Sequence, residues 1–460
     1  RSIPREDIAI ACIEDMLLRI RTHPSLAHFL GHDETFPTDT LDAAYRRMIE
    51  TYRLNRTYQP HSGAFNILDR DETGGTRTGT RELWTYAGPS HYYHIRNYGA
   101  WGFAQTGGIG GIAAPKDSLK QMMPEGAWWP PLKTEAWSFH SVIQGGDYFA
   151  AVTDAMNAKY GAPEDLDAFY RRIYAMNYNS ARGMYEAYAR NKYESTGITT
   201  WKYNAAWPAA MTWQYVDWYL RPTAAYYGAK KACEALHIQY AYDDEGVYVL
   251  NTLNDTFHGL NARATLHAFD GSVLESWEKT VEVGSDGKAL AFKVERPEDL
   301  DPTHFLRLTL DNAAGGRVSE NVYWLSTTPD IPGSSGYKLD RRFYTSPISQ
   351  ADFTLLQNLP AAALDLAAEA ETEDGEYVVK TTVTAPADKV AFLVRLDVTG
   401  GEAGRALPRS YWTDNHITLM PGQTRVLTVR IPMEELGGKT PALRAEGWNV
   451  AAQTVALPAP

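Results

Sequence analysis

The spacing of apolar residues changes near residue 237, and this change does most to limit what the chain can fold into. Up to about residue 235, short apolar runs alternate with helical patterns, which is typical of β/α units around a parallel sheet. From His237 onward, runs with a period of two residues follow one another without helices between them, which is typical of antiparallel sandwiches. The 460 residues also allow two or three domains. The sequence therefore predicts a multidomain chain with two kinds of sheet.

The first part of the chain predicts five strands with helices between several of them, or about five strand and helix pairs. After the opening helix, the expected strands cover residues 25–30, 57–63, 82–89, 99–105 and 197–206. The expected helices cover 41–52, 148–160, 163–191 and 222–236, and Thr38, Asp39 and Thr40 are candidate caps for the first of them. A closed β/α barrel needs eight strand and helix pairs. Either three units are missing at the front of a barrel, or the five strands form an open sheet.

The domain boundaries follow from these patterns. We assign residues 1–236 to the β/α part and residues 237–328 to a first antiparallel sandwich. A linker rich in Pro, Gly and Ser covers 329–341, and a second sandwich covers 342–460. No repeat joins the two sandwiches at the level of sequence.

Composition excludes several classes of function. The net charge of −12 argues against nucleic acid and anionic membranes as partners. Near the first residue, apolar side chains recur at helical spacing with charges between them, unlike a signal peptide or a membrane span. The twelve His show no metal-ligand spacing, and the sequence holds no dinucleotide, phosphate-loop or serine-nucleophile motif, so we expect no metal and no cofactor. Two cysteines exclude a disulfide framework and leave the compartment undecided. The location is therefore unknown from the sequence, with a periplasmic or secreted one favoured over a cytoplasmic one.

Two strand ends carry candidate catalytic groups. His32, Asp33 and Glu34 follow the strand expected at 25–30, and adjacent carboxylates on such a loop suit proton transfer when one of them is partly buried. The alternative is that both carboxylates are solvated and cap the next helix. Gln105 ends the strand expected at 99–105, just before the glycine-rich stretch 107–111. An amide here is a candidate hydrogen-bonding group at the mouth of a barrel.

Three stretches resemble one family of enzymes. Residues 196–251, from "TGITTWKYNAAWP" to "DDEGVYVLN", closely resemble the last barrel strand, the next helix and the start of the following sandwich in glycoside hydrolase family 2, in its exo-β-glucosaminidase and β-mannosidase branches. "RIRTHPSLAHFLGHDE" (19–34) looks like the family's fourth barrel strand, and "YWTDNHITLMPGQTRVLTV" (411–429) is similar to the end of its last sandwich. The resemblance implies a partial (β/α)8 TIM barrel, about strands 4–8, followed by two immunoglobulin-like sandwiches.

The resemblance also implies roles for particular residues. The family's general acid/base falls on Glu34, with Asp33 in reserve, and its nucleophilic glutamate falls on Gln105. Retaining glycosidases need two carboxyl groups about 5 to 5.5 Å apart, and an amide is a far poorer nucleophile than a carboxylate. Gln105 therefore implies a preserved pocket with little turnover, either in an inactivated variant or in a natural pseudoenzyme.

The same resemblance suggests a sugar-binding cleft at these strand ends. Trp207 matches the tryptophan that follows the family's last barrel strand, and Asn204 lies near it in the sequence. Weaker candidates for contact with the substrate are Trp201, Tyr203, Tyr86 and Trp101. Trp128 and Trp129 either form a wall of the cleft or pack against a neighbouring domain.

The implied function is that of a retaining exo-β-glycosidase of the β-mannosidase or exo-β-glucosaminidase type, acting on an oligosaccharide substrate. The alternative is a noncatalytic carbohydrate-binding pseudoenzyme in which Gln105 is native. A third and weaker alternative is an adhesive or structural protein in which only the sandwiches matter. The resemblance further implies N-terminal domains and three barrel strands that this sequence lacks, and we expect them in a second chain or a processed fragment.

Overall fold

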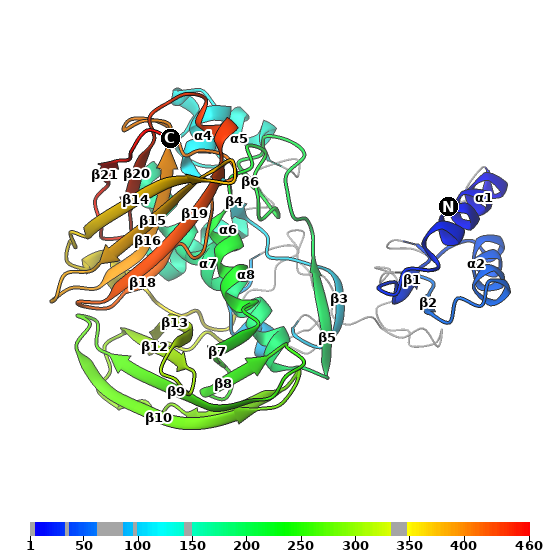
Figure 1. Ribbon diagram of the computed structural model, residues 1–460, viewed down its shortest axis with the longest axis horizontal. Helices are drawn as coiled ribbons and strands as arrows, with labels where there is room; N and C mark the ends of the chain where they lie inside the picture. Colours follow the sequence, from blue (N-terminus) through cyan, green and yellow to red (C-terminus); the bar gives the residue numbers. More distant parts are fainter. Residues whose placement is uncertain (1–4, 33–35, 62–85, 95–98, 142–149, 333–346) are drawn as a thin grey trace.

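The computed structural model describes residues 5–32, 36–61, 86–94, 99–141, 150–332 and 347–460 (Figure 1). An N-terminal unit lies to one side of a larger body. In that body, helices of the middle part of the chain contact two β-sandwiches formed by the last half of the chain.

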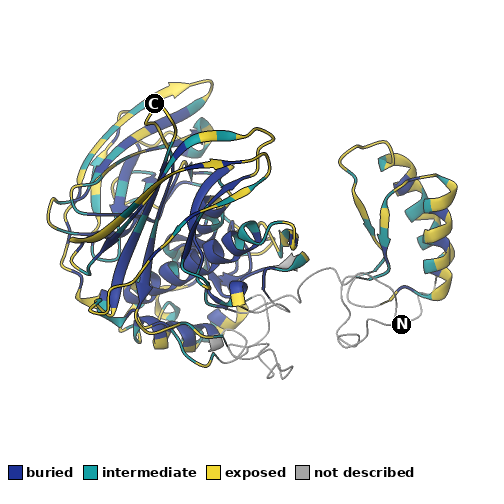
Figure 2. Ribbon diagram, turned by 90° about the horizontal axis from the view of Figure 1, so that it is seen from below, coloured by how far each residue is buried: buried dark blue, intermediate teal, exposed yellow. Residues whose placement is uncertain are grey.

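The N-terminal unit has its own small core. It contains α1 (Glu6–Ile20), β1 (His28–Leu30), α2 (Asp39–Thr51) and β2 (Thr57–Gln59), and the two strands pair in parallel. Thr38 caps α2, because its hydroxyl accepts a hydrogen bond from the backbone N–H of Leu41. Its packed apolar cluster contains the buried residues Leu17, Ala44, Met48 and Leu54, and Leu41 of α2 is buried as well. Figure 2 shows that much of the surface of α1 remains exposed.

The middle of the chain is mainly helical. Its elements are α3 (His91–His94), β3 (Gly102–Gly107), β4 (Ile112–Ala113), α4 (Lys116–Met122), the 3-10 helix η1 (Glu125–Ala127), α5 (Glu135–Phe139), α6 (Ala150–Tyr160), α7 (Leu166–Arg190), β5 (Ser195–Thr200), β6 (Met211–Thr212) and α8 (Ala224–Ala232). Most side chains of α7 are buried, which is typical of a helix enclosed by other elements. β3 and β5 pair in parallel, and β4 and β6 pair antiparallel.

Four of the five strands expected before residue 236 are present. They are β1, β2, β3 and β5, within two residues of the expected starts except for β1 and β3, which begin three residues late. The expected strand at 82–89 is different: residues 82–85 lie outside the described residues, and 86–89 form no strand. There Gly88 starts a turn, since its carbonyl accepts a hydrogen bond from the His91 N–H. The described residues therefore form two separate parallel pairs, not a continuous run of five barrel strands or an open five-stranded sheet.

The first antiparallel sandwich follows α8 directly. Its strands are β7 (Leu236–Tyr240), β8 (Gly246–Asn251), β9 (Phe257–His267), β10 (Val273–Val283), β11 (Lys288–Lys293), β12 (Thr303–Asp311) and β13 (Arg317–Ser326). One sheet has the order β10-β9-β12-β13 and the other β11-β8-β7. The sequence patterns missed β10, because this edge strand is mostly exposed and carries little apolar alternation.

The second sandwich packs two four-stranded sheets. After the 3-10 helix η2 (Thr354–Asn358) come β14 (Asp365–Glu373), β15 (Glu376–Thr384), β16 (Ala391–Thr399), β17 (Tyr411–Trp412), β18 (Ile417–Leu419), β19 (Thr424–Pro432), α9 (Met433–Leu436), β20 (Ala442–Glu446) and β21 (Gln453–Ala456). The sheet orders are β14-β15-β19-β17 and β18-β16-β20-β21. Both sandwiches confirm the antiparallel architecture expected after residue 237.

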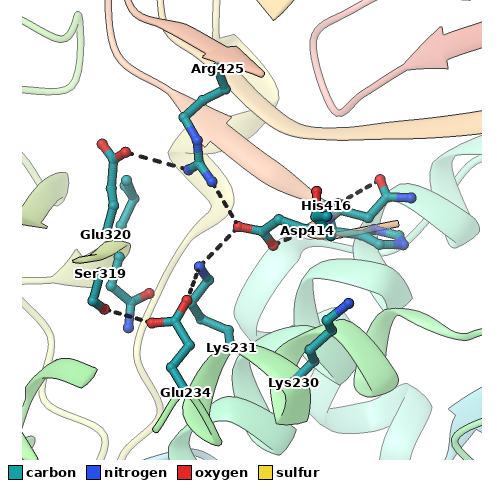
Figure 3. A network of polar contacts seen from close by, with 12 residues as sticks. Lys230, Lys231, Glu234, Ser319, Glu320, Asp414, His416 and Arg425 are labelled. Carbon is teal, nitrogen blue, oxygen red and sulfur yellow. Dashed lines mark hydrogen bonds and ion pairs between the residues drawn. The ribbon is translucent and has the colours of Figure 1, made fainter. Parts of the chain in front are cut away.

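A chain of buried charges connects the helical part to both sandwiches (Figure 3). The ammonium of Lys231, in α8, lies 2.7 Å from a carboxylate oxygen of Glu234 and 2.9 Å from one of Asp414. Arg425 of β19 donates to the same Asp414 oxygen at 3.1 Å, and it also reaches Glu320 of β13 at 3.5 Å. One ammonium and one guanidinium thus join three parts of the fold.

The same junction holds a histidine between two carboxylates. His237 of β7 lies 2.9 Å from Glu234 and 3.1 Å from Glu186 of α7, measured from its ring nitrogens. Burial alone raises the pKa of Glu234, but the hydrogen bond from His237 and the charge of Lys231 outweigh it and bring the pKa to about 2. Burial lowers the pKa of His237, and its two carboxylate partners reverse this, so the net shift is upward. These interactions favour the charged forms of Glu234 and His237.

We predict that Asp414→Asn destabilises the protein strongly. The substitution keeps the side-chain shape but removes the negative charge that Lys231 and Arg425 share, and removing one partner of a buried ion pair costs about 3 to 5 kcal/mol. Glu278→Gln is the matched control, because its pair with Arg263 is exposed to solvent and should contribute little to stability. Denaturant unfolding measures both variants, and equal losses of free energy of unfolding would contradict the role of the buried junction.

Candidate active site

The parallel contact between β3 and β5 sets the geometry of the candidate site. In its register, Phe103 lies opposite Gly197 and Ala104 opposite Ile198. Gly197 has a φ of +154°, and a Cβ at this position would lie 2.7 Å from the Phe103 ring. The two strands pair at this spacing because residue 197 has no side chain.

The carboxyl ends of these strands bring two predicted residues onto one edge. Gln105 is in β3, and Trp201 directly follows β5. Beyond β3, a Cβ on Gly108 would lie 3.5 Å from the backbone oxygen of Trp201, so the two chain segments run close together there. Side chains at the carboxyl ends of parallel strands share one edge of a sheet, which is where β/α proteins place their active sites.

The segment after β5 is fixed through its backbone and presents its side chains to solvent. The carbonyl of Tyr203 accepts hydrogen bonds from the N–H groups of Tyr215 and Val216, and Asn204 forms a β-bridge with Val216. Tyr203 is 55% exposed and Trp207 is 48% exposed, and Asn204 is exposed as well. The Lys202 ammonium lies 4.6 Å from the centre of the Trp201 ring. This surface is aromatic and accessible.

Two aromatic residues that the sequence patterns did not single out contact Trp207. The Phe139 ring lies 5.5 Å from the Trp207 ring, edge to face, and the His140 ring lies 6.4 Å away and nearly parallel. Both residues end the short helix α5, in a stretch to which the patterns assigned no element. The only sequence signal was the aromatic pair in "AWSFH".

The predicted carboxylates belong to the other strand pair. Asp33 and Glu34 lie outside the described residues, and nothing is described of the Gln105 side chain. On either side of the gap, the Gly31 N–H donates to the Gln59 carbonyl at 2.8 Å, and the ring of Phe36 lies 4.3 Å from that of His61. In Figure 1, β1 and β2 lie on the N-terminal unit, apart from β3 and β5. The described residues therefore do not bring the two groups together, and their pairing stays a prediction.

Tyr86 and Trp101 lie elsewhere than Trp207. Tyr86 is buried and lines a cavity of about 430 Å³ together with Trp324 and Phe353, between the helical part and the first sandwich. Trp101 precedes β3, at the end of the strand opposite to Gly107. Their proposed contact with the substrate gains no support from this placement.

The side chains of Trp128 and Trp129 lie in different environments. Trp128 is partly buried against a core cluster that the helical part shares with both sandwiches, and its indole N–H donates to the Met123 carbonyl at 2.9 Å. Trp129 is 37% exposed. The two alternatives considered from the sequence, a wall of the cleft and packing against a neighbouring domain, both stay predictions for this pair.

The described residues hold no cluster of three or more His, Cys, Asp or Glu side chains that suits a metal ion. Within the same residues, no helix has the length and apolar character needed to cross a bilayer. The exposed side chains at this edge offer aromatic faces and, at Asn204, an amide.

Comparison with known proteins identifies relatives of the whole chain. Family models for the "Exo-beta-D-glucosaminidase Ig-fold domain" and the "Mannosidase Ig/CBM-like domain" match residues 342–450 and 246–328. The exo-β-D-glucosaminidase of Amycolatopsis orientalis is 31% identical over 95% of this chain and 43% of its own length. That of Streptomyces avermitilis is 30% identical over 97% of this chain and 50% of its own length. The chain thus spans about half the length of the curated relatives it matches.

A solved structure is also similar over nearly the whole chain. The A. orientalis exo-chitosanase CsxA superposes with a TM-score of 0.87 at 29% identity, over 99% of this chain and 54% of that one. Two variants of that enzyme, solved in complex with p-nitrophenyl-β-D-glucosamine, match with a TM-score of 0.86. In one of them alanine replaces a glutamate, and in the other alanine replaces an aspartate. These matches and the family models confirm that the two sandwiches are immunoglobulin-like.

We predict that Gly197→Ala disrupts the β3–β5 contact. The new methyl group would collide with the Phe103 ring in a backbone conformation that favours glycine, at a cost of about 2 kcal/mol. Gly108→Ala is the matched control, since its Cβ would make only an ordinary contact at 3.5 Å, and its stability should stay within about 1 kcal/mol of the parent. Thermal unfolding compares the two variants, and a Gly197→Ala protein as stable as the Gly108→Ala protein would show that the register is wrong.

Proposed function

We propose that this chain, a homologue of the exo-β-D-glucosaminidases of glycoside hydrolase family 2 over nearly its whole length, forms part of a retaining exo-β-glycosidase. Its substrate class is an oligosaccharide with a terminal β-linked sugar. Glucosamine is favoured over mannose at that end, because the relatives at about 30% identity are glucosaminidases. The observation that carries the proposal is this relationship together with the exposed aromatic edge at the carboxyl end of β3 and β5.

The proposed fold of the first 236 residues is a partial (β/α)8 barrel. The two parallel pairs support it, because β1 with β2 and β3 with β5 are neighbours in the order that consecutive barrel strands would have. Gln105 lies in the second half of β3, and Asp33 and Glu34 follow β1 in the sequence.

In the proposed mechanism, one carboxyl group attacks the anomeric carbon and the other protonates the leaving oxygen, and water then releases the sugar from the resulting covalent intermediate. Position 105 is the nucleophile position. A glutamine there has nearly the shape of a glutamate but no negative charge, so it binds a sugar without forming the intermediate at a useful rate. The chain as it stands is therefore proposed to bind its substrate class and to turn it over slowly.

Asp33 is the better candidate for the acid/base group. The glutamate replaced in one CsxA variant lies as many residues after the aspartate replaced in the other as Gln105 lies after Asp33 here. This equal spacing favours Asp33 over Glu34, in contrast to the assignment that the sequence resemblance implied. Glu34 is then proposed to be a neighbouring carboxylate without a direct role in the proton transfer.

A noncatalytic carbohydrate-binding protein is the second candidate. Gln105 itself favours it, because a native amide at the nucleophile position suits binding without hydrolysis. The two candidates differ in what a carboxylate at position 105 would do.

We predict that Gln105→Glu creates or raises hydrolytic activity. The carboxylate restores an anionic nucleophile, and the rate of release from aryl β-D-glucosaminides should increase by roughly a thousandfold or more. Gln105→Ala serves as the control, since it removes the amide without supplying a nucleophile. If the glutamate and alanine variants are equally slow on aryl β-glucosaminides and β-mannosides, the noncatalytic function is correct.

We further predict that Asp33 and Glu34 respond differently in the Gln105→Glu background. Asp33→Asn removes the proposed proton donor and should lower kcat by about 100-fold or more, whereas Glu34→Gln should lower it by less than about tenfold. The pH profile separates the roles, because only the Asp33 variant loses the decline in rate at high pH that reports an essential acid. A larger loss for the Glu34 variant would return the acid/base role to that residue.

A further inference from the structure

An exposed aromatic surface near the proposed site includes two residues to which no role has been given. Phe139 is 64% exposed, and with His140 it contacts the ring of Trp207. We call Phe139, His140 and Trp207 the aromatic platform. Its rings come from two segments about seventy residues apart in the sequence, and each segment is attached to the body by its own contacts.

The first set of contacts fixes the two segments to each other. A ring nitrogen of His140, Nδ1, lies 2.6 Å from the Pro208 carbonyl oxygen, and the His140 carbonyl accepts a hydrogen bond from the Ala210 N–H at 2.8 Å. Ser141 and Met211 then form a β-bridge. The position of the His140 ring against Trp207 is therefore set by backbone pairing on both sides.

The second set of contacts fixes the platform to the strands of the proposed site. Met211 also pairs with Ala113 of β4, which follows β3 and its glycine-rich turn. The aromatic platform is thus connected by strand pairing to β4, which follows β3, the strand that contains Gln105. This continuity places the platform on the side of the carboxyl ends of β3 and β5.

The helix that ends at Phe139, α5, packs against the core. Trp137 is almost fully buried and meets the ring of Phe169 edge to face at 6.1 Å. The Thr134 hydroxyl accepts a hydrogen bond from the Trp137 N–H and so caps α5. Phe139 is exposed because Trp137, two residues earlier, turns the opposite side of the helix inward.

An apolar surface that is held in place and yet exposed to solvent is typical of a ligand-binding site. Keeping a phenylalanine and a tryptophan in water forgoes the roughly 1.5 to 3 kcal/mol that burial of such a side chain supplies. Flat rings cover the C–H faces of sugars, and their π faces also attract an ammonium group. Two exposed residues close to these rings in the sequence, Ser138 and Asn204, carry polar side chains that can donate and accept hydrogen bonds.

We infer that the aromatic platform binds the second sugar ring of a β-linked glucosamine oligosaccharide, on the leaving-group side of the cleaved bond. This inference rests on the proposed function. An exo-acting site holds the terminal ring at the strand ends, so the rest of the oligosaccharide extends outward from that edge over the surface. The platform then selects for chain length, and it contributes nothing to binding of a single sugar with a small aglycone.

Calorimetric titration tests this with two ligands, methyl β-D-glucosaminide and the β-linked glucosamine disaccharide. The methyl glycoside is the one-ring probe, because an aryl aglycone would itself stack on the platform. Phe139→Ala should weaken binding of the disaccharide roughly five- to tenfold and leave binding of the methyl glycoside within about twofold. Tyr193→Ala is the matched control, since this residue is 70% exposed but precedes β5, at the opposite end of the strands.

Each outcome of the titration either supports or contradicts the inference about the aromatic platform. If Phe139→Ala and Tyr193→Ala bind the disaccharide as the parent does, the platform inference is wrong, while binding of the methyl glycoside still supports the proposed function. If Phe139→Ala weakens both ligands equally, the platform holds the terminal ring instead, and the inference fails again. If the parent binds neither ligand, the inference and the proposed function fail together. Thermal unfolding should be unchanged in Phe139→Ala, because little of this side chain is buried.

Discussion

The parallel contact between β3 and β5 is the constraint on which the rest of the proposed site depends. It requires a residue without a side chain at position 197, beside the ring of Phe103. From this contact follow the location of Gln105 and Trp201 on one edge and the close approach of Gly108 to the segment after β5. The exposed aromatic residues then continue outward from that edge. A site built on paired strands keeps its geometry better than one built on loops alone.

The buried charges at the junction of α8 with the sandwiches support the proposed site without being part of it. Lys231, Asp414 and Arg425 hold the second sandwich against the helical part, and Glu320 brings in the first. Buried ion pairs gain little net stability over apolar packing, but they tolerate few alternative arrangements. They therefore fix the position of the helical part, which contains β3 and β5, relative to the two immunoglobulin-like domains.

The sequence patterns predicted those features of the fold that depend on residues close together in the sequence. The long helix α7, the cap at Thr38 and most sandwich strands follow from apolar spacing and capping residues. Exposed β10 has almost no apolar alternation, so it was missed, and residues 86–89 were assigned to a strand although Gly88 begins a turn. The contact of Phe139 and His140 with Trp207 depends on the bridge between Ser141 and Met211, and no local pattern encodes a pairing of that range.

The central claim is that position 33 and position 105 face each other across the anomeric carbon of a bound sugar. A crystal structure of the complete protein with a glucosamine disaccharide tests it most directly. The account predicts that the carboxyl carbon of Asp33 and the amide carbon of Gln105 lie about 5 to 5.5 Å apart, on either side of the glycosidic bond. Side chains that are farther apart than about 9.5 Å, or that line different cavities, would contradict it.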